Sequence, residues 1–436
     1  MGPTCFGRYI LLERIASGGM GEVFIAVPRT LWGFDKFFAV KKILPALSQE
    51  PEFLSRFRDE ARLVIPMNHP NVVQVYEVGR VEESYFIAME LVEGCNVGQL
   101  LSRCWQYRHR QALPIPAALL IIRELLAGLE YCHRRTDGHG GSLGLVHRDV
   151  SPSNVLVSYE GAVKLADFGL ALSSIKVVHT KPNHVLGHLG YIAPEGLDGH
   201  RLDARADIFS AGVLLFELLT CQRFAPGSDP IAVRQQLLTR SQVRPSALRP
   251  EIPAEVDNVA MRAVAANPQD RYPTAQMFHD EVQRALVHFD AVYGARQLSH
   301  NVMHTLFDPQ RKRQQLMALA RGLDLDELEA SHPAGRTVCL GEAIPLAPPD
   351  LAADAEAPRR TFGTGKAVLT LIDDMFEGDT EPVRLSGAHE VELPEVRSSS
   401  SVRRSRRREW RTPAPARTGT SEPKRRPRFL KARTNQ

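Results

Sequence analysis

The spacing of two polar triplets around an asparagine constrains this chain more than any other feature of its sequence. The triplet His-Arg-Asp ends at Asp149, Asn154 follows five residues later, and the triplet Asp-Phe-Gly begins 13 residues after that at Asp167. A carboxylate such as Asp149 accepts the proton of an attacking hydroxyl, and the oxygens of Asn154 and Asp167 are ligands that Mg²⁺ prefers. Each triplet alone occurs by chance, but their order and gaps together predict a site for phosphate chemistry.

A glycine-rich turn lies far upstream of these triplets, between two segments that alternate like strands. Its glycines are Gly18, Gly19 and Gly21, and Ala16 stands where a further glycine would open the run. Small residues allow the backbone of a hairpin to close over phosphates. Such hairpins are common, so the turn alone is weak evidence for a nucleotide site.

A lysine on the next expected strand strengthens the nucleotide interpretation. Lys41 lies 20 residues beyond Gly21, in the apolar segment 37–44. A lysine in this setting is seldom a solvated surface residue, and its ammonium can hold the α- and β-phosphates of a nucleotide. Glu60 lies on the following helical segment, 52–65, from which it can pair with Lys41 and fix its direction.

Apolar periodicity predicts an α+β fold of two lobes. Strand-like segments dominate residues 8–91 and helical segments dominate residues 93–290, so we expect a β-rich N-lobe and a helical C-lobe. Residues 291–333 are predicted to form a helical extension. Residues 334–436 are weakly periodic, acidic and then basic, and are predicted to be mostly disordered. The expected strands are 9–15, 22–27, 37–44, 72–78 and 85–91, and the expected helices are 52–65, 97–103, 116–134, 204–220, 230–239, 254–265 and 274–293.

Composition argues against several other classes of protein. The six cysteines are scattered with no Cys-x-x-Cys pair, which disfavours a zinc site or disulfide framework and fits a reducing, cytoplasmic location. Residues 1–6 lack the basic and apolar regions of a signal peptide. The longest apolar stretches, 117–132 and 208–220, are too charged or too short for membrane spans, and we expect buried helices there instead.

Residues 8–290, nearly two thirds of the chain, resemble a eukaryotic-type protein kinase domain, and more narrowly the Ser/Thr kinases of bacteria. The glycine loop G-G-M-G-E-V, H-P-N at residues 69–71 and V-S-P-S-N at residues 150–154 look most like soluble myxobacterial-type kinases. The resemblance implies a bilobal kinase fold with ATP and Mg²⁺ as cofactors. It also implies transfer of the γ-phosphoryl group to Ser or Thr hydroxyls of protein substrates, in bacterial signalling.

The same resemblance implies roles for individual residues. Asp149 deprotonates the substrate hydroxyl, and Lys41 holds ATP phosphates with its direction fixed by Glu60. Asn154 and Asp167 hold Mg²⁺. The implied nucleotide site comprises Ile15, Gly18, Gly19, Gly21, Val23, Ala39, Lys41, Met89, Glu90, Val92 and Leu156.

Within that site, Met89 is by position the gatekeeper and residues 90–92 form the hinge that meets adenine. Val23, Ala39 and Leu156 would enclose the ring.

Other matched residues have structural or regulatory roles in the family. Asp207 matches a buried aspartate that anchors the catalytic loop, and Arg271 matches an arginine that pairs with Glu195. Arg148 would receive a phosphate in the activation segment, where Thr180 is the expected autophosphorylation site.

Two departures from the family pattern touch one spot. Ser151 replaces the lysine of the catalytic loop, and His188 replaces a threonine that usually bonds both the catalytic aspartate and that lysine. We hypothesise that His188, with its ordinary pKa of about 6.5 raised by Asp149, partly restores the missing positive charge. The alternative is that His188 only packs or forms a hydrogen bond. If both changes prevent efficient catalysis, the chain is a pseudokinase scaffold that binds ATP or partners.

The end of the chain is strongly basic. Residues 402–436 carry 13 Lys and Arg against two Glu, so the preceding 401 residues are mildly acidic within a total net charge of +4. This segment suits an anionic partner, either nucleic acid, a membrane surface or an acidic protein, or it docks on the acidic segment before it. The alternatives are a solvated tail with no partner, or a tail that is the main functional unit and is regulated by the kinase.

Overall fold

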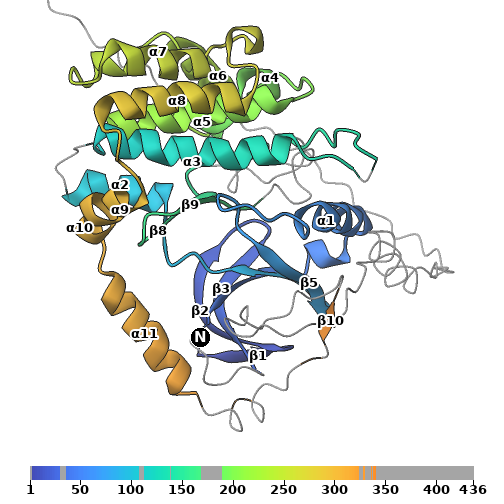
Figure 1. Cartoon of the computed structure of the whole chain (residues 1–436). Helices are drawn as coiled ribbons and strands as arrows, with labels where there is room; N and C mark the ends of the chain where they lie inside the picture. Colours follow the sequence, from blue (N-terminus) through green and yellow to red (C-terminus); the bar gives the residue numbers. More distant parts are fainter. Residues whose placement is uncertain are drawn as a thin grey trace, which may run out of the picture. The chain divides into compact units, whose positions relative to one another are not determined.

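The described part of the protein has two lobes, one built on a sheet and the other on helices (Figure 1). The computed structural model describes residues 2–29, 36–107, 112–137, 139–167 and 189–323, together with 328, 335 and 337–339. The α+β prediction with a β-rich N-lobe and a helical C-lobe is confirmed.

Within the described residues, the N-lobe sheet has seven antiparallel strands in the order β1-β2-β3-β4-β6-β5-β10. Helix α1 (Pro51–Val64) covers one face and buries Phe53, Phe57, Ala61 and Val64, which recur at helical spacing. The strands are β1 (Thr4–Phe6), β2 (Tyr9–Ser17), β3 (Gly21–Pro28), β4 (Phe38–Ile43), β5 (Val75–Val81), β6 (Ser84–Glu90) and β10 (Thr337–Cys339).

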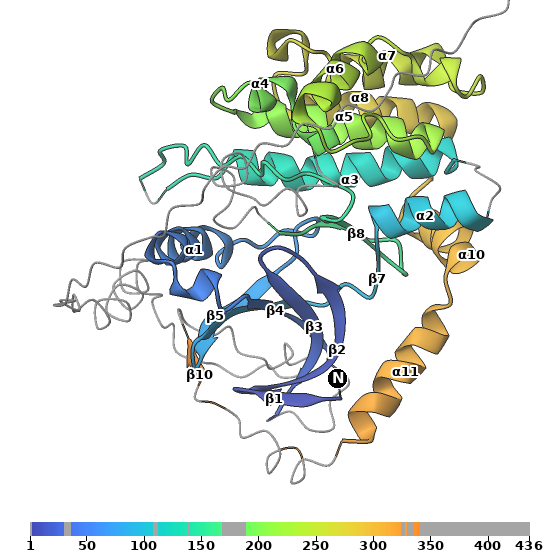
Figure 2. The ribbon, with the colours of Figure 1, turned by 180° about the vertical axis from the view of Figure 1, so that it is seen from behind.

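The C-lobe is assembled around two helices that are apolar on nearly every side. In α3 and α5 most positions are buried, as expected for core helices. A small sheet of β7 (Gly94–Asn96), β8 (Val155–Ser158) and β9 (Val163–Leu165) lies at the junction with the N-lobe, as Figure 2 shows. The helices are α2 (Val97–Tyr107), α3 (Ile115–His133), α4 (Pro194–Leu197), α5 (Ala204–Thr220), α6 (Pro230–Arg240), α7 (Ala254–Ala263) and α8 (Ala275–Phe289).

Local chemistry sets the ends of the long C-lobe helices. The carboxylate of Asp203 accepts the amide of Arg205 to begin α5, and Cys221 ends that helix with a left-handed φ of 53°. Thr274 caps α8 through the amide of Met277. Helix α8 ends at Phe289, earlier than the predicted helix 274–293. Across the described ranges, no helix is both long and apolar enough to cross a bilayer.

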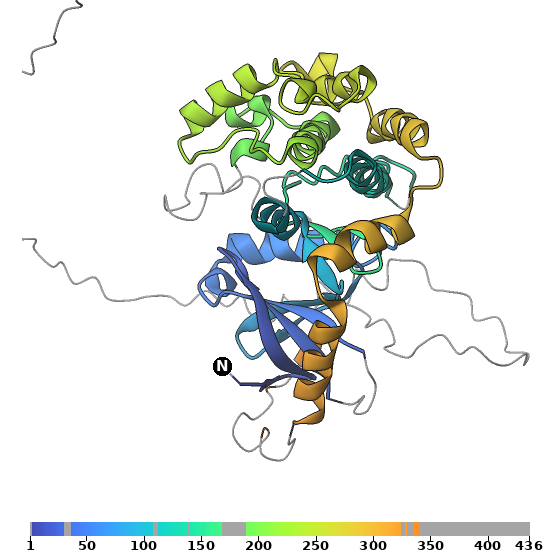
Figure 3. The same ribbon diagram turned by 90° about the vertical axis from the view of Figure 1, so that its left-hand side faces the viewer.

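The chain continues past α8 as an extension that returns to the N-lobe. It contains α9 (Ala295–Leu298), a π-helical turn (Ser299–Met303), α10 (His304–Leu306) and α11 (Pro309–Arg321). Figure 3 shows α11 running beside the N-lobe strands. Strand β10 follows and pairs with β5; it falls in the stretch predicted to be mostly disordered, and the sequence did not predict it. The basic segment 402–436 lies outside the described residues.

Candidate active site

Lys41 is held at the cleft between the lobes by an acidic partner. It lies on β4 with a 9% exposed side chain, and its Nζ is 2.8 Å from Oδ1 of Asp167. A buried ammonium is costly without such a partner. Glu60 lies on α1, but its side chain is outside the described part, so the predicted Lys41–Glu60 pair stays a prediction.

Asp149 and Asn154 are joined by two hydrogen bonds. The side-chain amide of Asn154 donates to the carbonyl of Asp149 at 2.8 Å and to its Oδ2 at 3.1 Å. Both partners are acceptors, so the nitrogen of Asn154 must face them and its Oδ1 points elsewhere. These bonds orient the carboxylate of Asp149 and leave an amide oxygen for a cation.

His147 links the catalytic loop to the strand that leads into Asp167. Its Nδ1 accepts the amide of Asp149 at 3.3 Å, so Nε2 carries the proton and donates to the carbonyl of Ala166 at 3.1 Å. Burial lowers the pKa of His147, in agreement with this neutral tautomer. One ring therefore fixes the spacing between the two functional aspartates.

Asp207 anchors the backbone of the same loop from α5. Its carboxylate is 1% exposed and accepts the amides of His147 and Arg148 and the ring Nε2 of His133, each at 2.8 Å. Burial opposes ionisation, but these hydrogen bonds together hold the pKa of Asp207 below its usual value.

Two residues of the candidate site have strained backbone conformations. Four non-glycine residues of the described part have positive φ, and two of them are Arg148 (64°) and Asp167 (52°). Such backbone conformations are costly and persist where the surroundings impose them, often at functional sites. Here the amide of Arg148 is fixed by Asp207 and the carboxylate of Asp167 by Lys41.

The glycines of the β2–β3 turn differ in what they do. A Cβ on Gly18 or Gly19 would meet no atom within 4 Å, whereas one on Gly21 would meet the carbonyl of Lys42 at 2.2 Å. Gly21 is thus required by packing against β4. Gly18 and Gly19 border open space, where their small size suits close approach of a ligand.

Several predicted nucleotide contacts come together from both lobes. Val23, Ala39 and Met89 of the N-lobe pack in one apolar cluster with Leu156 and Ala166 of the C-lobe. This arrangement provides apolar surfaces from both lobes at the predicted adenine site.

Other predicted contacts lie at the edges of that cluster. Ile15 on β2 is 43% exposed, and Val92 packs against the cluster just after β6. The carboxylate of Glu90 is directed away to Lys164, at 3.0 Å. The amide of Glu90 donates to the carbonyl of Gln74 at 2.8 Å, so neither this amide nor the paired carboxylate is left for a ligand.

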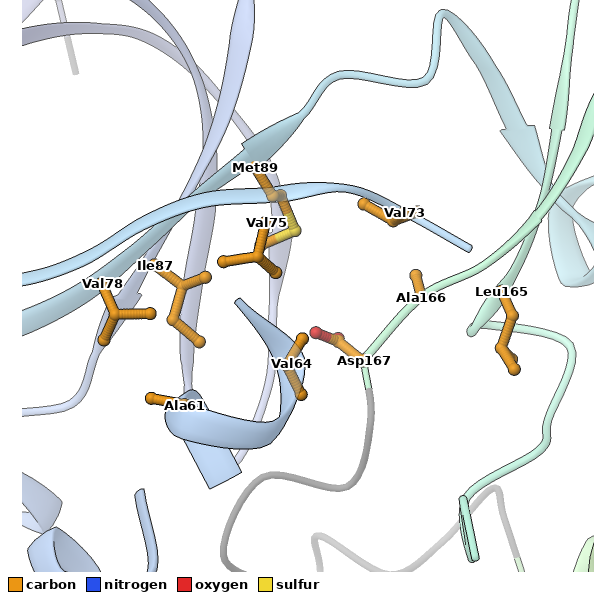
Figure 4. A pocket seen from close by; sticks show the side chains of 10 residues that line it. All are labelled: Ala61, Val64, Val73, Val75, Val78, Ile87, Met89, Leu165, Ala166 and Asp167. Atoms are coloured by element: carbon orange, nitrogen blue, oxygen red, sulfur yellow. The ribbon is translucent and has the colours of Figure 1, made fainter. Parts of the chain in front are cut away.

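A small apolar pocket lies behind Met89 (Figure 4). Its volume is about 30 Å³, and among the described residues that line it Asp167 alone is charged. The other lining residues come from α1, β5 and the segment before it, β6, and the end of β9 with the residue after it: Ala61, Val64, Val73, Val75, Val78, Ile87, Met89, Leu165 and Ala166. This pocket was not predicted, because its lining residues have the ordinary pattern of core strands.

The side chain at the missing lysine position is inaccessible. Ser151 is 1% exposed, and its hydroxyl lies 2.9 Å from that of Ser153. A serine carries no positive charge, and this one is too deeply buried to reach a bound phosphate. His188 and Thr180 lie outside the described residues.

The donor set fits Mg²⁺. The amide oxygen of Asn154 and the carboxylate of Asp167 are hard oxygen ligands, and the amide of Ala166 donates to the carbonyl of Asn154 at 2.8 Å, which keeps the two segments adjacent. Within the described ranges no three His, Cys, Asp or Glu side chains gather as a complete metal site. A magnesium ion would therefore need further oxygens from water and phosphate.

Known proteins match most of the described chain. The family model "Protein kinase domain" matches residues 9–282. Tyrosine-protein kinase MasK of Myxococcus xanthus is 39% identical over 64% of this chain and 43% of its own length. Serine/threonine-protein kinase PrkC of Bacillus subtilis is 31% identical over 67% and 42%. PknL of Mycobacterium tuberculosis, also named a serine/threonine-protein kinase, is 36% identical over 62% and 63%.

Among solved structures, the kinase domain of Mycobacterium tuberculosis PknI is 27% identical, with a TM-score of 0.48 over 65% of this chain and 98% of that one. The chain spans less than half the length of MasK and PrkC. The predicted resemblance to bacterial kinases, including a myxobacterial one, is confirmed. Because the family model covers more than half of the sequence, and its matched segment contains every motif described above, the chain belongs to the protein kinase family.

Proposed function

We propose that the chain is a protein kinase that transfers the γ-phosphoryl group of ATP to serine or threonine hydroxyls of protein substrates. The observation that carries this proposal is the meeting of four side chains at one cleft, where Lys41 pairs with Asp167 and Asn154 donates hydrogen bonds to Asp149. Phosphoryl transfer depends chiefly on positioning and on charge stabilisation, and these four side chains supply both.

Each side chain has one task in this proposal. Lys41 binds the α- and β-phosphates, and Asp149, oriented by Asn154, accepts the proton of the substrate hydroxyl. Asp167 and Asn154 would hold magnesium, which supplies charge neutralisation between the phosphates. Val23, Ala39 and Leu156 enclose the adenine ring, with Ile15 and Val92 at its edges.

The scaffold alternative rests on Ser151 alone among the described residues. Loss of one cation removes several kcal/mol of charge stabilisation at most, about the size of one oxyanion donor, and leaves Lys41 and Asp149 in place. We keep the hypothesis that His188 supplies part of the missing charge. His188→Ala should slow transfer and His188→Lys should preserve it with a flatter pH profile. If both variants transfer phosphate at the wild-type rate and with the wild-type pH profile, this role of His188 is refuted.

The acceptor residue needs its own test, because one relative is named a tyrosine-protein kinase and others are named serine/threonine-protein kinases. We favour serine and threonine, since the sequence V-S-P-S-N differs from the loops of tyrosine kinases. Wild-type protein would be incubated with labelled ATP and Mg²⁺, and the acid-hydrolysed product separated into phosphoamino acids. Phosphoserine or phosphothreonine supports the proposal, and phosphotyrosine alone would overturn the assigned acceptor.

Two further assignments belong to this proposal. A cytoplasmic location is proposed because the six cysteines are scattered and form no Cys-x-x-Cys pair. The basic segment 402–436 is proposed to bind an anionic partner. Association with DNA or acidic vesicles that weakens with salt and disappears on deleting 402–436 would support this assignment, and unchanged association would contradict it.

A further inference from the structure

The extension after α8 is anchored on the C-lobe before it leaves that lobe. The hydroxyl of Ser299 donates to the carbonyl of Tyr159 at 2.7 Å. The ring of Phe307 lies 6.2 Å from that of Tyr159, and the guanidinium of Arg103 stacks on it at 5.5 Å. Asp308 then caps α11 by accepting the amide of Arg311, so a new helix begins from a fixed point.

Helix α11 lies on the N-lobe sheet through one buried leucine. Leu316 is 3% exposed and packs in a cluster that also contains the hinge residue Leu91. On strand β3, Ile25 lies directly opposite Ala39 and therefore shares its face of the sheet, the face that carries the predicted adenine contacts. Leu91 also packs against the nucleotide cluster. The strand residues in the α11 cluster are Ile10, Leu12, Ile25 and Val27.

Two cations of α11 reach the margins of the nucleotide site. The ammonium of Lys312 lies 2.9 and 3.0 Å from the two carboxylate oxygens of Glu13, which is on β2 two residues before Ile15. The guanidinium of Arg313 lies 3.7 Å from Glu93, the residue after Val92. The helix thus touches the strand that carries the glycine turn and the segment that forms the hinge.

The extension has a second attachment at the far edge of the sheet. Val338 of β10 lies opposite Arg80 of β5, and the hydroxyl of Thr337 accepts the amide of Arg8 at 3.1 Å. Gly7 and Gly79 make room for it: added Cβ atoms would lie 2.0 Å from the hydroxyl of Thr337 and 2.8 Å from the carbonyl of Val338. The N-lobe therefore has small residues where the returning chain packs.

We propose that Lys312, Arg313 and Leu316 are positioning residues for the nucleotide site. By packing on β2 and β3 and pairing with Glu13 and Glu93, they hold the glycine turn and the hinge at the spacing that nucleotide binding needs. None of the three is part of the kinase motifs, and α11 lies beyond the matched segment 9–282. The inference rests on the proposed function only in requiring that the cleft binds nucleotide.

The test measures the affinity of the full chain for a fluorescent ADP analogue, a readout that needs no phosphate transfer. Leu316→Asp puts a charge into the buried contact, and Leu319→Asp is the matched control on the same helix, where the side chain is 40% exposed. We expect Kd to rise about fivefold in Leu316→Asp, the factor for a competent fraction near one fifth, and less than twofold in Leu319→Asp. Hydrogen exchange of the α11 amides reports whether the helix has been released.

A charge swap keeps the proposal testable if Leu316→Asp fails to fold. Lys312→Glu and Glu13→Lys each place like charges opposite one another, and the double variant restores an attractive pair. Each single variant should raise Kd about two- to fivefold, as for a partly exposed ion pair, and the double variant should return close to wild type.

The outcomes separate this inference from the proposed function. A wild-type Kd in Leu316→Asp, together with rapid exchange of the α11 amides, would overturn the inference, because the helix would be released without loss of affinity. Slow exchange of these amides in Leu316→Asp would also overturn it, because Leu316 would then not hold the helix. A double variant with a Kd no closer to wild type than those of the single variants would do the same. If the chain binds nucleotide but transfers no phosphate, the proposed function fails while the affinity series still decides the role of α11. A split in kinetics, with KM for ATP raised more than kcat is lowered, is the expected companion result.

Discussion

Replacement of Arg271 by lysine should destabilise the C-lobe although the charge is kept. All five N–H groups of this guanidinium are used. They donate to the carbonyls of Ala265, Ala266 and Arg205 at 2.7–3.0 Å and to both oxygens of Glu195 at 2.7 and 2.8 Å. Its side chain is fully buried. A lysine has three donors on one atom, so it cannot serve acceptors spread around a planar fork.

The expected loss follows from the donor count. Lysine leaves at least two of the five acceptors unserved, and each hydrogen bond to a charged group contributes about 1.5–3 kcal/mol, so Arg271→Lys should cost about 3 kcal/mol or more. Arg271→Met should cost about 3–5 kcal/mol, because the carboxylate of Glu195 stays charged and unpaired. The matched control is Arg284→Lys: this arginine pairs with Glu281 but its side chain is 66% exposed, and about 0.5 kcal/mol or less is expected.

Urea unfolding followed by circular dichroism at pH 7 measures these differences in the free energy of unfolding. If Arg271→Lys lies within about 1 kcal/mol of wild type, the argument from donor geometry is wrong and charge alone holds the contact.

Further predictions concern the cleft and its support. The folded pKa values of His147 and Asp207 both lie below their unfolded values, so the unfolded chain binds more protons as pH falls. The free energy of unfolding should therefore decrease below about pH 6.5 because of His147, and again below about pH 4 because of Asp207. Urea unfolding at a series of pH values checks this, and Asp207→Asn should lose less stability in the acidic range. Lys41→Met should abolish transfer and weaken nucleotide binding by about tenfold or more, seen by titration with an ADP analogue, whereas equal affinity would remove Lys41 from the phosphate site. Gly21→Ala should lower the free energy of unfolding by about 1–3 kcal/mol because its Cβ would meet the carbonyl of Lys42, and Gly18→Ala should leave it unchanged within about 0.5 kcal/mol; the reverse order in a urea series would contradict the packing argument.

Regular periodicity made most of the fold predictable. Helix α5 was predicted at its observed bounds, residues 204–220, because its long apolar stretch is interrupted by few charged residues. Strands β2, β3, β4 and β6 were predicted within three residues of their observed ends, since their alternation is clear. The polar residues of the cleft were found because a motif fixes both their types and their spacing.

What the sequence did not reveal depends on distant contacts. Lys41 was expected to pair with Glu60, and its described partner is Asp167, 126 residues away. The roles of His147 and His133 come from hydrogen bonds to Ala166 and Asp207, which no local pattern encodes.

The extension shows the same limit. Its helices were predicted from periodicity, but their return to the N-lobe was not. Three residues of β10 have too little pattern to be recognised, and only Gly7 and Gly79 mark the surface that receives them. The domain boundaries at 290 and 333 stay predictions.

The central claim is tested most directly by Asp149→Asn. Phosphate transfer from labelled ATP would be measured at saturating Mg²⁺ for wild type, Asp149→Asn and the control Asp229→Asn, which keeps a good cap on α6. ADP-analogue affinity would be measured in the same samples. We expect Asp149→Asn to bind nucleotide with the wild-type affinity and to transfer phosphate at about one hundredth of the wild-type rate or below. Asp229→Asn should match wild type in both measurements. Transfer by Asp149→Asn at the wild-type rate, or no transfer by a wild-type protein that binds nucleotide, would contradict the account.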